Sequence, residues 1–323
     1  MPRRFTPRND EKRLISMESM INSEQFRAIP GIIFNIQHFC IHDGPGIRTT
    51  VFFKGCPLSC VWCHNPEGIR VGRHLSFVES KCVMCGECAK ACPQAHRFES
   101  GKHEIFRDML PDVLYDESAA ACAANALTVV GRHVTAGEVF EQVLRDRRFY
   151  EDGGGVTFSG GEPAMQREFL AALLRLSSGA GIHTAIETCG LCDFAYYESI
   201  LPYVDLFLYD YKETDPEKHK RYTKSDNALI IENIGRLHDA GANVMLRCPV
   251  IPGVNDDDEH FRAIAALTIQ YPNLIGADIL PYHRLASSKA DRMGLERKDD
   301  YAQPSPETAT FRRCVSVFEK AQE

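Results

Sequence analysis

From Thr49 to His283 the chain repeats one pattern, in which a short apolar run is followed by a stretch with helical spacing of apolar residues. We expect strands near residues 49–53, 153–163, 183–190, 204–212, 243–253 and 274–283. We expect helices over residues 135–150, 165–181, 227–241 and 256–271. The strands are apolar on both faces, as buried parallel strands are. The pattern therefore predicts an α/β fold, a partial parallel (β/α)6 TIM-like barrel, with a doubly wound open sheet as the alternative.

Polar motifs follow the predicted strands, at the end where barrels of this kind place their active sites. These motifs are KGC at 54–56, SGGEP at 159–163, ETCG at 187–190, DYK at 210–212, RCPVIPG at 247–253 and LPYH at 280–283. Thr135, with Glu138 three residues later, predicts a capping box at the start of one helix. The sequence thus predicts one site assembled from several strand ends.

Composition limits the classes of function. The net charge of −7 favours neither nucleic acid nor anionic lipid as a partner. No apolar run approaches the length of a membrane span, and no apolar segment of a signal peptide follows the basic start. Thirteen cysteines in a long chain without such a signal indicate metal sites or reactive thiols in a reducing cytoplasm. Five scattered cysteines are interpreted as small apolar residues, namely Cys40, Cys189, Cys192, Cys248 and Cys314.

The alternation of strands and helices stops between Leu75 and Gly131. This segment contains a second group of cysteines, Cys82, Cys85, Cys88 and Cys92. We expect residues 75–131 to form a small inserted domain within a barrel made of residues 31–74 and 132–323. Residues 1–30 are expected to be a polar N-terminal extension.

The first cysteine group has an unusual ligand count. Cys56, Cys60 and Cys63 have the spacing C-x3-C-x2-C, and no fourth cysteine follows nearby. A structural zinc site normally has four protein ligands. Three thiolates on one short loop suit a [4Fe–4S] cluster with one iron open to a small molecule. The alternative is a zinc site with His64, Cys40 or His42 as the fourth ligand.

With Trp62 before the last cysteine, this motif resembles the radical S-adenosylmethionine superfamily. The segments DGPGIR at 43–48, GGGVTFSGGEP at 153–163 and LPYH extend the resemblance over residues 31–295. They resemble the activating enzymes of glycyl radical enzymes, in particular those of pyruvate formate-lyase-like enzymes that carry a ferredoxin-type insert. The resemblance implies that the open iron binds S-adenosylmethionine and that an electron from the cluster cleaves it to a 5′-deoxyadenosyl radical. That radical would abstract a hydrogen atom from a glycine Cα of a partner glycyl radical enzyme.

The resemblance also implies roles for residues of this sequence. Catalysis would depend on the three cysteines and on Lys212, which lies near the polar groups of the cofactor. The turn of Gly160, Gly161 and Glu162 would meet the amino group of the cofactor. The remaining cofactor-binding positions implied are Trp62, Cys63, His64, Glu187, Thr188, Asp210, Tyr211, Arg247 and His283. Among these, Trp62 and His64 would lie near the adenine, Arg247 would contact a carboxylate or ribose, and Glu187, Thr188 and Asp210 would lie near a monovalent cation.

The residues themselves leave other interpretations open. Gly160 and Gly161 could form a plain turn, and Asp210 and Lys212 could be solvated charges at a strand end. A single histidine such as His283 commonly has a structural role. Trp62 is equally suited to the core. The loop residues Asp43, Gly44 and Arg48 would by resemblance receive the partner's glycyl loop, although the residues alone indicate only a turn before a strand.

The second cysteine group has the spacing C-x2-C-x2-C-x3-C-P of bacterial ferredoxins, in which the fourth cysteine of each run serves the other cluster. Counting back from Cys122 by the same intervals gives Ser118, Tyr115 and Asp112, so a second run is missing. The sequence therefore predicts one [4Fe–4S] cluster in the insert. Its ligands would be Cys82, Cys85, Cys88 and Cys122, with Cys92 unused. The alternatives are Cys92 in place of Cys122, or a zinc knuckle.

The insert is expected to pass electrons to the open-iron cluster from a flavodoxin or a ferredoxin-type reductant. Oxygen-sensitive clusters imply an anaerobic cytoplasm. Two other hypotheses remain: a radical enzyme that acts directly on a small molecule, and a non-catalytic iron–sulfur electron carrier or zinc-binding module.

Overall fold

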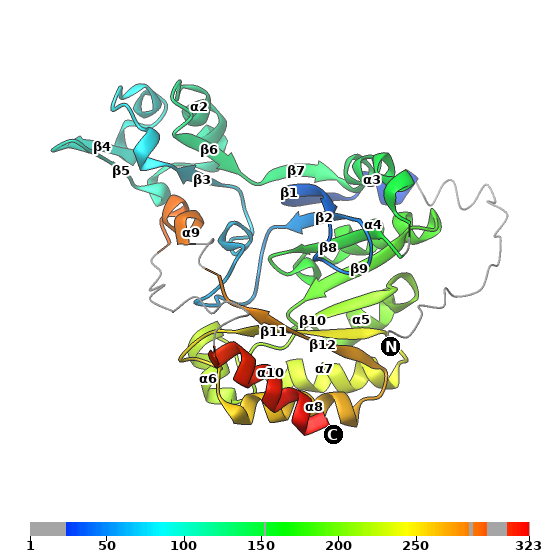
Figure 1. Ribbon diagram of the computed structural model, residues 1–323. Coiled ribbons are helices and arrows are strands. Elements are labelled where there is room, and N and C mark those ends of the chain that lie inside the picture. Colours follow the sequence, from blue (N-terminus) through cyan, green and yellow to red (C-terminus); the bar gives the residue numbers. More distant parts are fainter. Residues whose placement is uncertain (1–23, 152, 284–286, 296–308, 323) are drawn as a thin grey trace.

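The computed structural model describes residues 24–151, 153–283, 287–295 and 309–322 (Figure 1). Its centre is an eight-stranded sheet in the order β12-β11-β10-β9-β8-β2-β1-β7. Six neighbouring strands are parallel. They are β2 (Arg48–Phe53), β8 (Gly155–Gly160), β9 (His183–Thr188), β10 (Leu206–Asp210), β11 (Val244–Val250) and β12 (Leu274–Pro281). These are the six strands expected from the apolar runs.

The order of the six parallel strands follows the chain without a reversal. A doubly wound sheet instead reverses its strand order at a switch point. The observed winding is therefore that of a partial barrel, left open because the edge strands β7 and β12 do not pair with each other among the described residues. Two strands that the sequence did not predict, β1 (Pro30–Cys40) and β7 (Arg132–Thr135), extend the sheet in antiparallel pairing.

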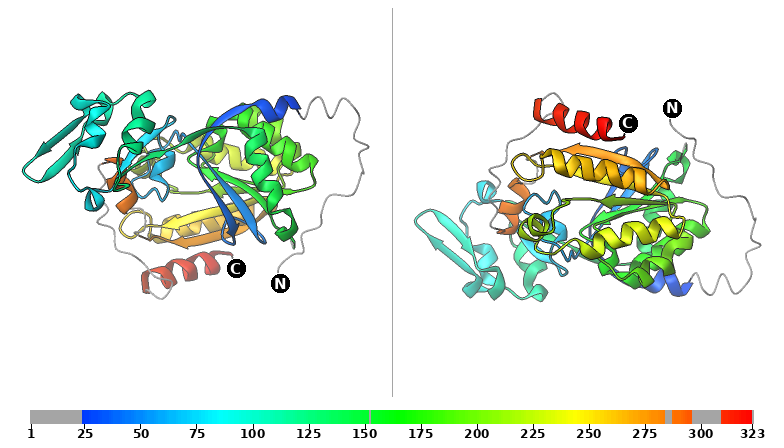
Figure 2. Two further views of the ribbon diagram at one scale, coloured as in Figure 1. Left: turned by 90° about the horizontal axis from the view of Figure 1, so that it is seen from above. Right: turned by 90° about the horizontal axis from the view of Figure 1, so that it is seen from below.

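Helices cover the outer face of the curved sheet (Figures 1 and 2). They are α3 (Ala136–Arg145), α4 (Arg167–Gly179), α5 (Phe194–Ile200), α7 (Ala228–Asp239) and α8 (Asp258–Gln270), and α10 (Ala309–Gln322) packs against α8. Helix α6 (Pro216–Thr223) instead ends against the loop after β2, where the carbonyls of Tyr222 and Thr223 accept hydrogen bonds from the amides of Val61 and Ser59. The expected capping box is present, since Glu138 N donates to Thr135 Oγ1 and the Thr135 amide donates to the Glu138 carboxylate. The main hydrophobic core lies between these helices and the sheet.

Side chains alternate between this core and the concave face of the sheet. On β10, Phe207 and Tyr209 belong to the main core, whereas Leu206 and Leu208 form a separate cluster with Ala185 and Met245. Asp210 has the same parity as Leu208. Polar side chains at the strand ends therefore face the concave side of the sheet. The residues that alternate with them along the strand pack into the main core and hold the strand in place.

The insert forms a separate lobe above the sheet (Figure 1). The strands β3 (His74–Phe77) and β6 (Leu127–Val130) pair with each other and not with the main sheet, and β4 (His96–Glu99) and β5 (Lys102–Ile105) form a hairpin. One short α-helix, α2 (Tyr115–Ala120), precedes β6. Short 3-10 helices complete the fold: Pro66–Gly68, Glu79–Lys81, Glu87–Lys90, Pro93–Ala95, Arg107–Met109, Asp112–Leu114, Arg147–Phe149, Pro163–Met165 and Leu201–Tyr203.

Helix α9 (Ser287–Met293) lies between the insert and the barrel. Lys289 forms an ion pair with Glu67, with Nζ 3.3 Å from Oε1. On the insert side, the Arg107 guanidinium donates to the carbonyl of Arg292 at 3.0 Å and to that of Leu75 at 3.2 Å. One helix thus links both lobes.

Of the expected extension at residues 1–30, the first 23 lie outside the described residues. Residues 24–28 are helical, Phe26 packs against the main core, and β1 begins at Pro30. None of the described helices is long and apolar enough to cross a membrane.

Candidate active site

The loop after β2 carries the cysteines of the C-x3-C-x2-C motif. Its start is held by two backbone hydrogen bonds, from the Gly55 amide to the Gly68 carbonyl at 2.7 Å and from the Cys56 amide to the Ile69 carbonyl at 3.1 Å. Cys56, Cys60 and Cys63 are not in disulfides, and all three are half-buried. The three thiols thus lie on a loop that is anchored at its start and partly accessible.

The thiols share one small region with Lys212. Burial raises the pKa of the Cys60 thiol to about 12; the nearby Lys212 ammonium lowers this pKa, while Cys63 and Cys56 raise it further. These influences act only over short distances. The structure therefore brings Lys212, from the end of β10, next to the cysteine loop.

Cys189 is a neighbour that the sequence analysis did not connect with the motif. All five scattered cysteines are buried, as expected. Cys189 in addition hydrogen-bonds Cys56, which lowers the pKa of the Cys56 thiol and raises that of Cys189. Its position in the ETCG segment, next to Thr188, was the available signal.

The glycine turn after β8 packs against the cysteine loop. A Cβ at Gly161 would lie 2.2 Å from the Gly55 carbonyl oxygen and 2.5 Å from that of Gly68. Gly160 has a φ of +110°, and a Cβ there would lie 2.3 Å from the Phe53 amide nitrogen. The two glycines therefore allow three backbone segments to meet, which is a structural reason for them besides the expected approach to a cofactor.

Glu162 is buried, and its carboxylate is occupied by protein donors. It accepts hydrogen bonds from the amide of Ala164 at 3.0 Å, from the amide of Cys189 at 2.7 Å and from the hydroxyl of Thr188 at 2.9 Å. Burial raises the pKa of this carboxyl, whereas these hydrogen bonds lower it. Glu162 and Thr188 thus tie the glycine turn to the end of β9.

Charged residues from three adjacent strands line the concave face. The parallel register places Arg247 beside Asp210 on one side and Asp278 on the other. Arg247 Nη1 lies 3.8 Å from Asp278 and donates to the His42 carbonyl at 2.8 Å. Its Nε is buried without a hydrogen-bond partner among the described residues. Arg247 lies within β11 rather than at its end, because the strand continues to Val250.

Lys212 and Asp210 form an ion pair with a distance of 2.8 Å between Nζ and Oδ2. Burial lowers the pKa of Lys212, but the charges of Asp210 and Cys60 raise it more, so that it lies well above its ordinary value. Lys212 is thus fixed as a cation. Tyr211, between the two, points to the opposite face, where its ring is buried and its hydroxyl donates to Thr214 at 3.1 Å.

Glu187 lies near this pair and accepts a hydrogen bond from Ser159. Burial raises the pKa of the Glu187 carboxyl to about 7; the charges of Asp210 and Asp43 raise it as well, and Arg247 counteracts them. The concave face therefore contains three carboxylates within mutual electrostatic reach.

Two histidines meet at the end of the last strand. The rings of His64 and His283 are stacked, with centroids 4.0 Å apart and an interplanar angle of 8°. Nδ1 of His283 is buried without a hydrogen-bond partner among the described residues. Trp62 is buried in a small cluster with Ile251, Val254 and Tyr282. Its environment is that of a core side chain.

The loop containing Asp43 and Gly44 is held by Arg48. The Arg48 guanidinium donates to the carbonyls of Pro45 at 3.0 Å, Gly153 at 3.1 Å and Val156 at 2.7 Å. Arg48 is completely buried. This corrects the expectation that Arg48 contacts a partner: it shapes the loop from below and has no surface to offer.

A cavity of about 900 Å³ opens next to this loop on the concave side of the sheet. Its walls come from the loop, from β10 to β12 and from α10. The lining residues are Ile41, His42, Gly44, Pro45, Leu206, Leu208, Met245, Arg247, Ile275, Ala277, Asp278, Ile279, Leu280, Val315, Phe318, Glu319 and Gln322. Asp43, between the lining residues His42 and Gly44, accepts a hydrogen bond from Thr50 at 2.6 Å.

In the insert, four cysteines line one cavity, namely Cys82, Cys85, Cys88 and Cys122. Cys92 does not line it: its thiol donates to the carbonyl of Met109 at 3.4 Å, and its side chain packs in the insert core with Leu110 and Tyr115. The cavity walls are otherwise mostly apolar. Two buried histidines next to these cysteines, His96 and His103, were not identified from the sequence.

Comparisons with known proteins agree with this arrangement. Residues 120–264 match the family model of the radical SAM superfamily, and residues 75–95 match that of a 4Fe-4S binding domain. The chain is 38% identical over 265 residues to the trans-4-hydroxy-L-proline dehydratase activating enzyme of Clostridioides difficile, covering 81% of this chain and 87% of that protein.

Two further relatives are 40% identical to the chain. The isethionate sulfite-lyase activating enzyme of Nitratidesulfovibrio vulgaris matches over 90% of this chain and 96% of its own length. The choline trimethylamine-lyase activating enzyme of Oleidesulfovibrio alaskensis matches over 82% and 87%, respectively. The chain belongs to the glycyl radical enzyme activating enzymes of the radical SAM superfamily.

Proposed function

We propose that this chain generates a 5′-deoxyadenosyl radical in the barrel and uses it to take a hydrogen atom from a glycine Cα of a partner glycyl radical enzyme. The observation that carries this proposal is the convergence of the three thiols of one loop, the Asp210–Lys212 ion pair and the glycine turn at one end of the parallel strands. A simple electron carrier has no need for such a site.

The residues present fit a [4Fe–4S] cluster with one open iron. Cys56, Cys60 and Cys63 supply three thiolates on one loop, and no described neighbour offers an obvious fourth ligand, since the Cys189 thiol is buried and hydrogen-bonded to Cys56. The cluster and S-adenosylmethionine supply the radical chemistry when bound. The protein supplies position, charge and exclusion of water.

Protein groups around the loop can orient S-adenosylmethionine. Lys212, held as a cation by Asp210, presents positive charge toward the polar groups of the cofactor. Arg247 and His283 each have a buried nitrogen that no described residue partners, a condition that costs free energy unless another group supplies the missing contact. The backbone of Gly160 and Gly161 lies against the cysteine loop, where no side chain could intervene.

Carboxylates of the concave face support a monovalent cation site. The charges of Asp210 and Asp43 raise the pKa of the Glu187 carboxyl, and a bound cation would relieve this cost of ionisation. Thr188 is a weaker candidate ligand, because its hydroxyl already donates to Glu162.

The cavity beside Gly44 and Pro45 is the proposed place of the partner's glycyl loop. The loop that Arg48 holds in place bounds this cavity. Arg247 lies in the cavity wall, on the side where the cofactor is proposed to bind. Its apolar lining from β10 and β12 suits an extended backbone with small side chains.

We further propose that residues 75–131 are an inserted domain with a second [4Fe–4S] cluster on Cys82, Cys85, Cys88 and Cys122. The common cavity of these four thiols, and the different surroundings of Cys92, support this ligand set over the one with Cys92. The insert would relay electrons from a flavodoxin or ferredoxin-type reductant in an anaerobic cytoplasm.

The test begins with the reconstituted protein under anaerobic conditions. After reduction with dithionite and addition of S-adenosylmethionine, 5′-deoxyadenosine should form with the native chain and not with Cys60→Ala. Cys92→Ala serves as the matched control and should retain activity. A candidate partner, added next, should acquire a glycyl radical signal in electron paramagnetic resonance.

Each failure has a distinct meaning. One outcome is that 5′-deoxyadenosine forms and a small molecule is turned over, while no glycyl radical enzyme acquires a radical. This outcome would support direct action on a small substrate. A fully loaded protein that produces no 5′-deoxyadenosine, with or without partner, would support the electron-carrier hypothesis.

A further inference from the structure

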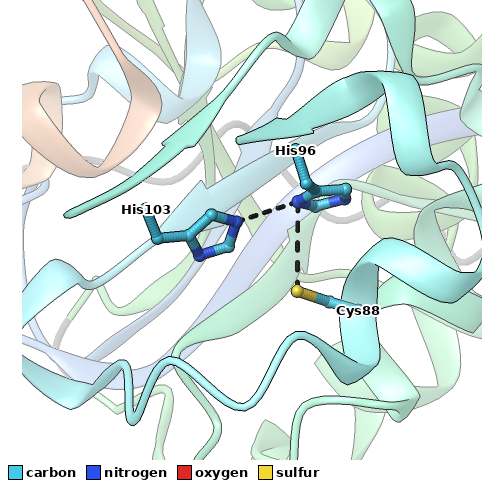
Figure 3. Close-up of side chains that lie close together, drawn as sticks. All are labelled: Cys88, His96 and His103. Atoms are coloured by element: carbon cyan, nitrogen blue, oxygen red, sulfur yellow. Dashed lines mark hydrogen bonds between the residues drawn. The ribbon is translucent and has the colours of Figure 1, made fainter. Parts of the chain in front are cut away.

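The hairpin β4–β5 places two buried histidines next to the cysteines of the insert (Figure 3). His96 Nδ1 lies 2.9 Å from His103 Nε2 and 3.9 Å from Cys88 Sγ. At the other end of the pair, His103 Nδ1 lies 3.5 Å from Cys82 Sγ. The two imidazoles thus form a hydrogen-bonded chain. His103, at its end, faces Cys82, and His96 lies near Cys88.

The direction of the hydrogen bonds in this chain follows from counting donors. Two imidazole nitrogens at 2.9 Å must be one donor and one acceptor, so at least one of the rings is neutral. If His96 Nδ1–H donates to His103 Nε2, the remaining proton of His103 is on Nδ1, directed at Cys82. Only the lone pair of His96 Nε2 is then left without a partner.

The opposite direction is unfavourable. His103 Nε2–H would donate to His96 Nδ1, and the lone pair of His103 Nδ1 would face a Cys82 thiolate. His96 would carry its proton on Nε2, which is buried and has no partner among the described residues. A buried donor without an acceptor and a lone pair against a thiolate both cost free energy. Thiolates at Cys82 and Cys88 therefore select the first direction.

We propose that His103 donates an N–H···S hydrogen bond to the Cys82 thiolate of the insert cluster, and that His96 is the positioning residue that fixes the tautomer of His103. This inference rests on the proposed second cluster. Its consequence is a higher reduction potential of that cluster, because a hydrogen bond to a ligating sulfur withdraws negative charge and favours the reduced state.

The surroundings make this donor important. The cavity of the four cysteines is lined by apolar side chains, among them Phe77, Phe98 and Leu127. The Ala126 amide is a comparable backbone donor, 3.3 Å from Cys122 Sγ. His103 is held in place by Phe98, whose ring stacks on the imidazole with centroids 4.1 Å apart. Its donor is thus pre-oriented and protected from water.

The experiment uses the full chain with Cys60→Ala, which removes the barrel cluster and leaves the insert cluster as the source of the signal. The midpoint potential is measured by redox titration with electron paramagnetic resonance in three versions of this chain, with native His103, His103→Phe and His103→Asn. The phenyl ring keeps the shape and lacks the donor, whereas the asparagine Nδ2 can replace Nδ1 as a donor. His133→Phe, at an exposed histidine of β7, is the matched control.

We expect His103→Phe to shift the midpoint potential to a more negative value, His103→Asn to return most of that shift, and His133→Phe to leave the potential unchanged. Equal potentials in the native and His103→Phe chains, both with full iron content, would overturn the proposal. Equal shifts in the Phe and Asn variants would also overturn it, because they would indicate packing alone.

A second measurement needs no substitution at His103. In the Cys60→Ala chain labelled with ¹⁵N-histidine, pulsed electron paramagnetic resonance of the reduced cluster should detect a weak histidine nitrogen coupling. No coupling, or a strong coupling typical of direct ligation to iron, would overturn the inference while leaving the second cluster intact. Zinc in place of iron and sulfide in this chain would instead overturn the proposed cluster, and the inference with it.

Discussion

His64 and His283 lie face to face, with ring centroids 4.0 Å apart, although 219 positions separate them in the chain. This stack joins the residue after the last cysteine of the motif to the end of the final barrel strand. Nδ1 of His283 is buried and has no hydrogen-bond partner in the part of the chain that the structure describes.

We expect His283→Ala to weaken the binding of S-adenosylmethionine to the cluster-loaded protein about tenfold, or about 1.4 kcal/mol. The variant loses both the stack and the nitrogen that is available for the cofactor. Anaerobic equilibrium binding measures the effect, with His133→Ala, at an exposed position, as the control. Unchanged affinity would assign His283 a purely structural role.

Arg48→Lys should destabilise the protein although it preserves the charge. One ammonium cannot replace a guanidinium that donates to three carbonyls and to Thr157 Oγ1 at 2.6 Å. We expect a loss of about 2–4 kcal/mol, since several buried acceptors would remain unpaired. Urea unfolding measures this, and hydrogen exchange should show faster exchange in residues 43–47. Equal stability would mean that the loop does not depend on Arg48.

Glu162→Gln should cost about 1–3 kcal/mol of stability. An amide group cannot accept at both positions, so one of its N–H bonds would face the amide of Ala164 or Cys189. The exposed Glu168→Gln, on α4, is the control and should have little effect. If the two variants unfold at the same urea concentration, the hydrogen bonds of Glu162 contribute nothing net.

The raised pKa of Glu187 predicts that the metal-free protein loses stability as the pH rises. Its pKa is raised from the ordinary 4.5 to about 7, so the folded state holds a proton that the unfolded chain has already lost in this range. Stability associated with this group is complete below about pH 4.5 and is lost as pH rises through about 7.

Glu187→Gln should therefore be more stable than the native chain at pH 8, by about 3 kcal/mol, and nearly equally stable near pH 4.5. Urea unfolding across this pH range measures the difference. A constant difference at all pH values would show that the carboxyl does not titrate as described.

Cys122→Ala should remove the iron of one cluster, about four atoms per chain, whereas Cys92→Ala should not. The reason is geometric, because Cys122 lines the cavity with Cys82, Cys85 and Cys88 and Cys92 points to the Met109 carbonyl. Iron and sulfide analysis of the reconstituted variants gives the answer. The reverse pattern would show that Cys92 is the fourth ligand.

The sequence predicted the parallel strands well because each one is a compact apolar run between turns. It did not predict β1 and β7, whose pairing is antiparallel and whose residues are partly exposed, so that neither shows a continuous apolar run. The β4–β5 hairpin was missed for the same reason: His96 and His103 face the buried side, where an apolar pattern would ordinarily be expected.

Within the site, spacing along the chain identified the cysteine loop and the charged strand ends, but it could not tell which side chains are already occupied. Arg48 is adjacent to an exposed loop in sequence, yet its length lets it reach back under that loop to three carbonyls. Tyr211 stands between two concave-face residues, and strand alternation turns it into the core. The position of the Arg48 side chain depends on carbonyls far along the chain, whereas that of Tyr211 follows from local strand alternation.

The packing of Cys92, Leu110 and Tyr115 in the insert has a consequence for how the protein matures. Domains that are built around metal alone cannot fold before the metal arrives. In this lobe the apolar cluster is completed by Leu75 and Leu127; of the four cavity cysteines, Cys88 belongs to it and Cys122 packs against it. We therefore expect part of the lobe to be folded before the proposed cluster is assembled.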